Sequence, residues 1–231
     1  PEWAAYRKWL RVPMASHWYR YHISVFNDND PEHLPGDPYL LQGARDALAM
    51  GVRPLPYVLS TIWDSDTQSY FRENAVRAAM LDEDGTPYPW RIGEQMFHWM
   101  CPATEQWRAK IRETCAKLIL EHGMAGVYLD VLAAGGARGC YSTEHGHPVH
   151  GGNYQFTGNR QLMVDLRSHI RRLKPDAAFF AEGIDEVYND IMDGYLTLDF
   201  TRMYEGNGEQ VWPIWTAVYH PYAINFGADP V

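Results

Sequence analysis

The sequence lacks an uninterrupted apolar run of about 18 residues, so it gives no indication of a membrane-spanning helix. It has only three cysteines, Cys101, Cys115 and Cys140, which are too few for a disulfide framework. Cys115 falls in a helical pattern, and we expect it to be a buried thiol. A disulfide between Cys101 and Cys140 is a possibility that the sequence does not decide, because both residues follow candidate strands and could meet above one sheet.

Positive charge is also scarce. Lys and Arg number 20 against 29 Asp and Glu, and the net charge of −9 disfavours nucleic acid and anionic membranes as partners. No G-x-G-x-x-G turn follows a strand-like run, which disfavours a dinucleotide-binding open sheet. The chain begins with Pro1 and shows no signal peptide, so we expect a processed or partial product.

The 231 residues have an ordinary globular composition, with 46% hydrophobic and 21% charged residues. This length and the absence of a linker predict one domain over residues 1–231. Aromatic residues make up 14% of the chain. Sugar-binding clefts use aromatic faces as platforms, although large α/β cores also contain many aromatics.

Helical patterns alternate with short apolar runs along the chain. Helices are predicted at 1–10, 37–50, 104–121 and 159–173, and strands at Trp18–Phe26, 53–59, 126–131, 177–182, Tyr195–Phe200 and roughly Ile214–Phe226. This alternation predicts an α/β fold with a parallel sheet. Polar or acidic residues follow every predicted strand, which favours a (β/α)8 TIM barrel. A full barrel takes about 250 residues, and residues 132–158 form an apparent insertion, so we expect an incomplete barrel of about six strands.

Two of these strands end on a carboxylate, Asp130 and Glu182, with a helix pattern between them. Neighbouring strands lie about 4.8 Å apart, so the two side chains would emerge together at one edge of the sheet. Retaining glycosidases hold their two carboxyl groups about 5–5.5 Å apart, whereas inverting enzymes need about 6.5–9.5 Å. The pattern therefore predicts a retaining glycoside hydrolase. The alternative is that either acid caps a helix or pairs with an arginine.

The surroundings of the two acids suggest their roles. Asp130 has little charge nearby and a short side chain, which suits a fixed nucleophile. Glu182 follows Phe179 and Phe180 and precedes further acidic residues, and such neighbours raise a carboxyl pKa toward that of a general acid. We therefore expect Asp130 to attack the sugar and Glu182 to act as acid and base.

The apparent insertion contains three histidines, His145, His147 and His150. They allow a second hypothesis, a metal-dependent hydrolase with Asp130 as a further ligand. A metal site in a barrel would draw its histidines more naturally from strand ends than from one loop. We therefore expect no metal and no cofactor, and we expect His145 to contact sugar hydroxyls. The remaining alternative is a surface loop with incidental histidines.

Further candidate sugar-binding residues follow the other predicted strands: Trp63, Asp64, Asp199, Arg202, Tyr219 and His220. An aspartate beside a tryptophan suits a hydroxyl clamp with a stacking face. The alternative for that pair is a core tryptophan and a loop-capping aspartate. Asp199 and Arg202 could equally form an ion pair with each other.

Several segments together resemble a known family. They are Tyr21–Phe26, Leu55–Val58 with Trp63-Asp64, Met100–Thr104 with Trp107, Gly126–Asp130, Cys140-Tyr141 with His145–Pro148, Glu182-Gly183 with Glu186–Tyr188, and Val218–His220. Their order is similar to that of bacterial glycosidase-like barrels classed as a domain of unknown function. These barrels are distantly similar to α-amylase-type and endo-α-N-acetylgalactosaminidase barrels.

The resemblance implies that a catalytic aspartate ends the fourth barrel strand and a catalytic glutamate the fifth. It thus implies Asp130 as nucleophile and Glu182 as acid and base, acting on α-linked sugars. Tyr128 stands where the amylase pattern has an arginine, and Pro221 follows His220 where the pattern has an aspartate, which argues against starch. The resemblance also implies that the chain begins after the first barrel strand and ends before the eighth.

These observations predict a carbohydrate substrate, an oligosaccharide or glycoconjugate. A secreted or periplasmic location would suit such an enzyme. A non-catalytic carbohydrate-binding barrel is a further alternative, because the chain is expected to be incomplete.

Overall fold

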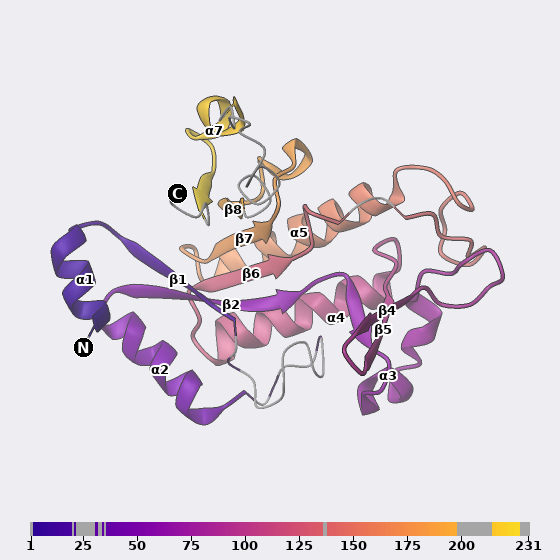
Figure 1. Cartoon of the computed structure of the whole chain (residues 1–231), viewed down its shortest axis with the longest axis horizontal. Helices are drawn as coiled ribbons and strands as arrows, with labels where there is room; N and C mark the ends of the chain where they lie inside the picture. Colours follow the sequence, from indigo (N-terminus) through magenta and orange to yellow (C-terminus); the bar gives the residue numbers. More distant parts are fainter. Residues whose placement is uncertain are drawn as a thin grey trace.

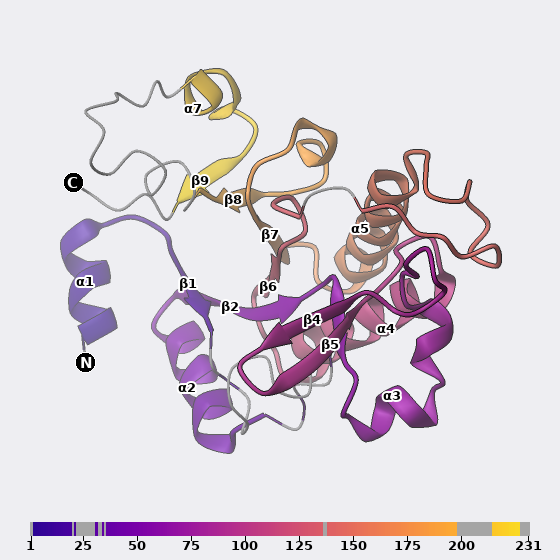
Figure 2. The ribbon, with the colours of Figure 1, turned by 45° about the vertical axis from the view of Figure 1, so that its right-hand side comes forward.

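A computed structural model describes residues 2–19, 21, 31, 34, 36–135, 138–197 and 214–226. Its centre is a six-stranded sheet in the order β1-β2-β6-β7-β8-β9, in which every neighbouring pair is parallel. The strands are β1 (Met14–Trp18), β2 (Val52–Leu59), β6 (Gly126–Asp130), β7 (Ala178–Glu182), β8 (Gly194–Leu196) and β9 (Ile224–Phe226). The strands fan round from β1 to β9 into a curled half-barrel (Figure 2). The predicted α/β fold with about six parallel strands is confirmed.

Helices cover the outer face of this sheet (Figure 1). They are α2 (Pro38–Ala49), α4 (Glu105–Ala116) and α5 (Tyr154–Leu173), whereas α1 (Glu2–Leu10) lies beyond the start of β1 and its described side chains are exposed. The α4 helix continues as a wider turn, η2 (Lys117–Glu121), so the predicted helix at 104–121 is confirmed. The α5 helix begins at Tyr154, five residues before the predicted start. No helix among the described residues is long and apolar enough to cross a membrane.

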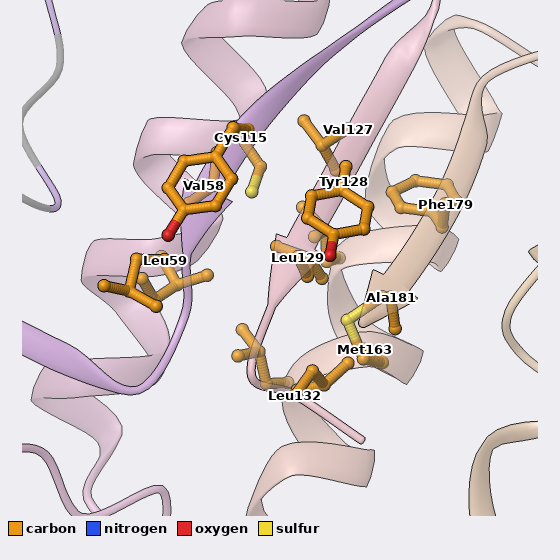
Figure 3. Packing of buried hydrophobic residues seen from close by; sticks show 14 of the residues in the cluster. Val58, Leu59, Cys115, Val127, Tyr128, Leu129, Leu132, Met163, Phe179 and Ala181 are labelled. Carbon is orange, nitrogen blue, oxygen red and sulfur yellow. The ribbon is translucent and has the colours of Figure 1, made fainter. Parts of the chain in front are cut away.

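The core lies between the sheet and α4 and α5. Side chains alternate along a strand, so Val127 and Leu129 on β6 and Phe179 on β7 point to the same face. Figure 3 shows them packed against Cys115 from α4 and Met163 from α5, and all five are fully buried. Each buried aliphatic or aromatic side chain of this size contributes roughly 1.5–3 kcal/mol. The same alternation turns the intervening residues of each strand toward the inside of the half-barrel.

Two predicted strands differ most from the structure: one lies earlier in the chain than expected, and the other is partly a helix. Strand β1 spans Met14–Trp18, whereas a strand was expected at Trp18–Phe26; residues 22–26 lie outside the described residues. The predicted strand at Ile214–Phe226 is wrong in its first half, which forms helix α7 (Ile214–Tyr219) before β9. Its apolar residues have the i, i+1, i+4 and i+5 spacing of a helical face, and Pro221 follows shortly after the helix ends.

A second, antiparallel sheet follows β2 and was not predicted. It contains β3 (Ile62–Asp64), β4 (Pro89–Ile92) and β5 (Gln95–Trp99) in the order β3-β5-β4. A two-residue loop joins β4 to β5, and its first residue, Gly93, has the positive φ of 61° that tight hairpin turns require. Between β3 and β4 lie α3 (Gln68–Arg72) and the short helix η1 (Ala75–Ala78).

Candidate active site

The two predicted catalytic acids lie side by side. Asp130 ends β6 and Glu182 ends β7, and the parallel register pairs the preceding residues, Leu129 with Ala181. Both carboxyl groups are half-buried, and Glu182 lies close enough to Asp130 to lower the pKa of Asp130 through a side-chain hydrogen bond. Two carboxyl groups can share such a bond only when one of them carries a proton. Glycosidic cleavage uses one carboxyl group in each of these two forms.

Two tyrosine hydroxyls hold the carboxyl group of Asp130. Tyr57, on the neighbouring strand β2, donates to Oδ2 at 2.8 Å, and Tyr128 donates to Oδ1 at 3.1 Å. The main chain of Tyr57 is fixed in turn by the hydroxyl of Tyr21, which donates to its carbonyl oxygen at 2.9 Å. Burial raises the pKa of Asp130, whereas the bonds from Tyr57, Tyr128 and Glu182 favour its charged form.

Tyr128 also forms part of an aromatic wall inside the half-barrel. Its ring centroid lies 4.0 Å from that of His17 and 6.0 Å from that of Tyr57. Burial, followed by the charges of Asp130 and Glu182, raises the pKa of Tyr128, which keeps its hydroxyl a donor. Tyr128 and His17 both line a cavity of about 420 Å³. Burial lowers the pKa of His17 to about 4.

The turn after β6 joins the two acids through the backbone. Val131 has a φ of 61°, a left-handed conformation that is rare for a β-branched residue. Its N–H donates to Oε2 of Glu182 at 3.1 Å, and the N–H of Ala133 donates to the Glu182 carbonyl at 3.2 Å. Gly183, with a φ of 73°, packs against the same turn so closely that a Cβ would lie 2.8 Å from backbone atoms of Ala134. The ends of β6 and β7 are therefore locked together.

Trp63 and Asp64 lie on β3, outside the parallel sheet. The Trp63 side chain is fully buried beside Trp107, with ring centroids 5.7 Å apart. Asp64 is also buried, and its Oδ1 accepts the N–H of Asp66 at 2.9 Å. The indole has no exposed face in this structure, and the sugar-binding roles of both residues stay predictions.

Of the four candidate sugar-binding residues nearest the C-terminus, the structure describes two. The Tyr219 hydroxyl donates to the carboxylate of Glu186, which follows β7. His220 is exposed, with Nδ1 3.1 Å from the carbonyl oxygen of Thr216. Asp199 and Arg202 lie outside the described residues. The sugar-binding roles of all four stay predictions.

The histidines of the loop between β6 and α5 do not gather around Asp130. His145 and His147 lie with Cys101 and Cys140 in a cluster in which one nitrogen or sulfur atom of each residue lies within 4.8 Å of the others. His150 instead stacks on Tyr141, with ring centroids 4.5 Å apart. All three cysteines are free thiols, so no disulfide joins Cys101 to Cys140.

Tyr57 and Tyr128 were missed as functional residues. The signal is the two-residue period of a strand: Tyr128 precedes Asp130 by two residues, so both side chains point to the same face. Tyr57 is opposite Tyr128 in the register of β2 and β6. That register could not be read from the sequence.

Comparison with known proteins places this arrangement in context. A Bacteroides thetaiotaomicron protein named "Putative glycoside hydrolase" is 28% identical over 193 residues, which cover 83% of this chain and 28% of that protein. A Monosiga brevicollis protein with a similar name is 28% identical over 242 residues, 96% of this chain and 20% of the relative. The chain thus spans about a quarter of the length of these relatives.

Solved glycosidase structures share the fold. The α-N-acetylgalactosaminidase NagBb from Bifidobacterium bifidum superposes with a TM-score of 0.73 at 14% identity, covering 96% of this chain and 35% of that one. The maltogenic α-amylase AmyB from Thermotoga neapolitana gives 0.63 at 11% identity, covering 97% of this chain and 52% of that one. A family model described as a domain of unknown function, DUF6259, matches residues 1–229, and the chain therefore belongs to this family.

Proposed function

We propose that the protein is a retaining glycoside hydrolase in which Asp130 is the nucleophile and Glu182 the general acid and base. The observation that carries the proposal is the pair of neighbouring carboxyl groups at the ends of two adjacent parallel strands. Barrel enzymes place their catalytic residues at the C-terminal ends of strands, where these two residues lie. The names of the relatives and the fold shared with glycosidases agree with this proposal.

The hydrogen bonds made to Asp130 support the division of roles. Asp130 accepts hydrogen bonds from two tyrosine hydroxyls, and such bonds stabilise the carboxylate form. The proton of the pair accordingly belongs on Glu182, the residue that must protonate the leaving oxygen. Asp130, oriented through both of its oxygens, is the better placed of the two to attack the anomeric carbon.

The reaction then follows in two steps. Asp130 attacks the anomeric carbon as Glu182 gives its proton to the glycosidic oxygen, forming a glycosyl ester on Asp130 and releasing the alcohol. Glu182, now a carboxylate, takes a proton from a water molecule that attacks the same carbon and frees Asp130. Retaining enzymes hold these groups about 5–5.5 Å apart, so the sugar must displace the direct bond between the two acids.

We further propose an α-linked substrate. This preference rests on the resemblance to α-amylase-type barrels and on the fold shared with NagBb, an α-N-acetylgalactosaminidase by its name. Tyr128, in the place of the amylase-type arginine, argues against starch itself.

The test uses the protein at its full natural length and a panel of aryl α- and β-glycosides. Asp130→Asn and Glu182→Gln are each expected to lower kcat/KM by at least about 1,000-fold, whereas Asp165→Asn, on the surface of α5, leaves it unchanged. Azide separates the roles: it should restore turnover in Glu182→Ala with a glycosyl azide of retained configuration, and in Asp130→Ala with an inverted one. Undiminished hydrolysis by Asp130→Asn would refute the assignment.

A further inference from the structure

Four side chains outside the carboxyl pair converge on one point. Cys101 follows β5, and Cys140, His145 and His147 come from the loop between β6 and α5. Both cysteines are fully buried, and both histidines are half-buried. One sulfur or nitrogen from each residue lies within 4.8 Å of all the others. Two thiols and two imidazoles are a ligand set typical of structural zinc.

Two sulfur–nitrogen distances within the cluster match those of a tetrahedral site. Sγ of Cys101 lies 3.5 Å from Nε2 of His147, and Sγ of Cys140 lies 3.5 Å from Nδ1 of His145. With Zn–S about 2.3 Å and Zn–N about 2.0–2.1 Å, a tetrahedral ion separates its sulfur and nitrogen ligands by about 3.6 Å. Both sulfur–nitrogen pairs therefore span an edge of the expected size without any rearrangement.

The second ring nitrogen of each histidine faces a backbone carbonyl. Nε2 of His145 lies 2.9 Å from the carbonyl oxygen of Arg77, and Nδ1 of His147 lies 2.9 Å from that of Pro148. A metal-bound histidine donates its other N–H to such a group, which fixes the tautomer and turns the free lone pair toward the metal. The His147 ring also stacks on Tyr154 at 3.9 Å.

The Cys140 sulfur has partners suited to a thiolate. The N–H of Leu81 donates to it at 3.4 Å, and Nδ1 of His145 lies 3.5 Å away. A thiolate is the form that binds metal. The cluster thus has four candidate ligands, and backbone groups orient three of them.

We propose that Cys101, Cys140, His145 and His147 bind one zinc ion in a closed tetrahedral site. Two thiolates neutralise the divalent charge, and their protons leave to solvent as the ion binds. Four protein ligands leave no open position, so the ion is structural and not catalytic. The proposal departs from the expectation of no bound metal, and it differs from the metal-hydrolase hypothesis because Asp130 is not in the cluster.

The ion would anchor the loop that leaves the carboxyl pair. This loop begins at Val131, directly after Asp130, and the site ties it to Cys101 at the end of the small sheet. The N–H of Tyr141 donates to the carbonyl of Leu81 at 2.9 Å, which adds a second attachment on the same side. A disulfide between Cys101 and Cys140 would give a similar anchor but would leave both oriented histidines without a role.

Elemental analysis of the purified full-length protein tests the proposal. Wild type should contain one zinc ion more per chain than Cys140→Ser, and Cys101→Ser and His147→Ala should lose the same ion. Cys115→Ser, whose thiol lies in α4 outside the cluster, and His150→Gln, in the same loop, should keep it. Loss of a ligand should weaken binding by more than the roughly 10–100-fold that loss of an outer-shell partner costs.

Cobalt substitution covers the case in which a variant does not fold. Wild-type protein loaded with Co²⁺ should show the intense visible bands of a tetrahedral ion and a near-ultraviolet band from two thiolates. The proposal would be overturned by equal zinc in wild type and Cys140→Ser, or by an octahedral cobalt spectrum. It would also be overturned if the protein, as first isolated, contained a Cys101–Cys140 disulfide and no zinc. None of these readouts depends on glycosidase activity.

Discussion

The backbone N–H of Val131 donates a hydrogen bond to Oε2 of Glu182 at 3.1 Å. Val131 directly follows Asp130, so this one bond ties the proposed nucleophile to the proposed acid through a single peptide unit. Val131 also has a φ of 61°, which costs on the order of 1–3 kcal/mol in a β-branched residue. Strain of this kind persists where the surrounding structure holds it, and here the contact with Gly183 does so.

Replacing Gly183 with alanine should disrupt this contact. A positive φ costs alanine about 1–2 kcal/mol, and the new Cβ would lie 2.8 Å from backbone atoms of Ala134, adding roughly 1–3 kcal/mol. Gly123→Ala is the matched control, because Gly123 has a φ of 74° and no heavy atom within 4 Å of a Cβ. Denaturant unfolding should show a larger loss for Gly183→Ala. Equal losses would mean that the close packing contributes nothing.

Tyr57→Phe should move the acidic limb of the pH–activity profile to higher pH. The Tyr57 hydroxyl lowers the pKa of Asp130, so its loss raises that pKa, and the nucleophile is protonated at a higher pH. At neutral pH kcat/KM should fall on the order of tenfold. Tyr70→Phe removes a buried hydroxyl that contacts His98 instead, and its profile should match wild type. An unmoved acidic limb in Tyr57→Phe contradicts the role given to this bond.

His17 should make stability depend on pH. Burial lowers its pKa to about 4 in the folded protein, against 6.5 when exposed, and its Nε2 has no hydrogen-bond partner among the described residues. The unfolded chain therefore takes up a proton first, so stability declines as pH falls from about 6.5 toward about 4, on the order of 2–3 kcal/mol. His17→Phe should lose less stability than wild type over this window. Exposed His169→Gln should lose as much as wild type.

The central parallel strands could be predicted from the sequence because local patterns determine them. The runs ending at Asp130 and Glu182 are apolar almost throughout, as strands covered on both faces are, and the helices before them end at clear signals. The same patterns placed the two acids side by side. What they could not supply was the register that brings Tyr57 opposite Tyr128 and beside Asp130.

The remaining features depend on contacts between distant parts of the chain. Strand β3 has only three residues, too short to show a period, and its partner β5 lies thirty residues further on. Cys101 precedes α4 in the sequence and Cys140 follows β6, so their cluster brings together residues that are distant along the chain. The histidines were noticed, but the glycine-rich loop has no period that predicts which way they turn.

Trapping the glycosyl intermediate tests the central claim most directly. A fluorosugar with a good leaving group, added to Glu182→Ala in the full-length protein, should form an ester that is hydrolysed slowly. Mass spectrometry of the digested protein should then find the added sugar on Asp130. The account is contradicted if the sugar is found on another residue, or if the wild-type enzyme turns the substrate over with inversion and without any labelled intermediate.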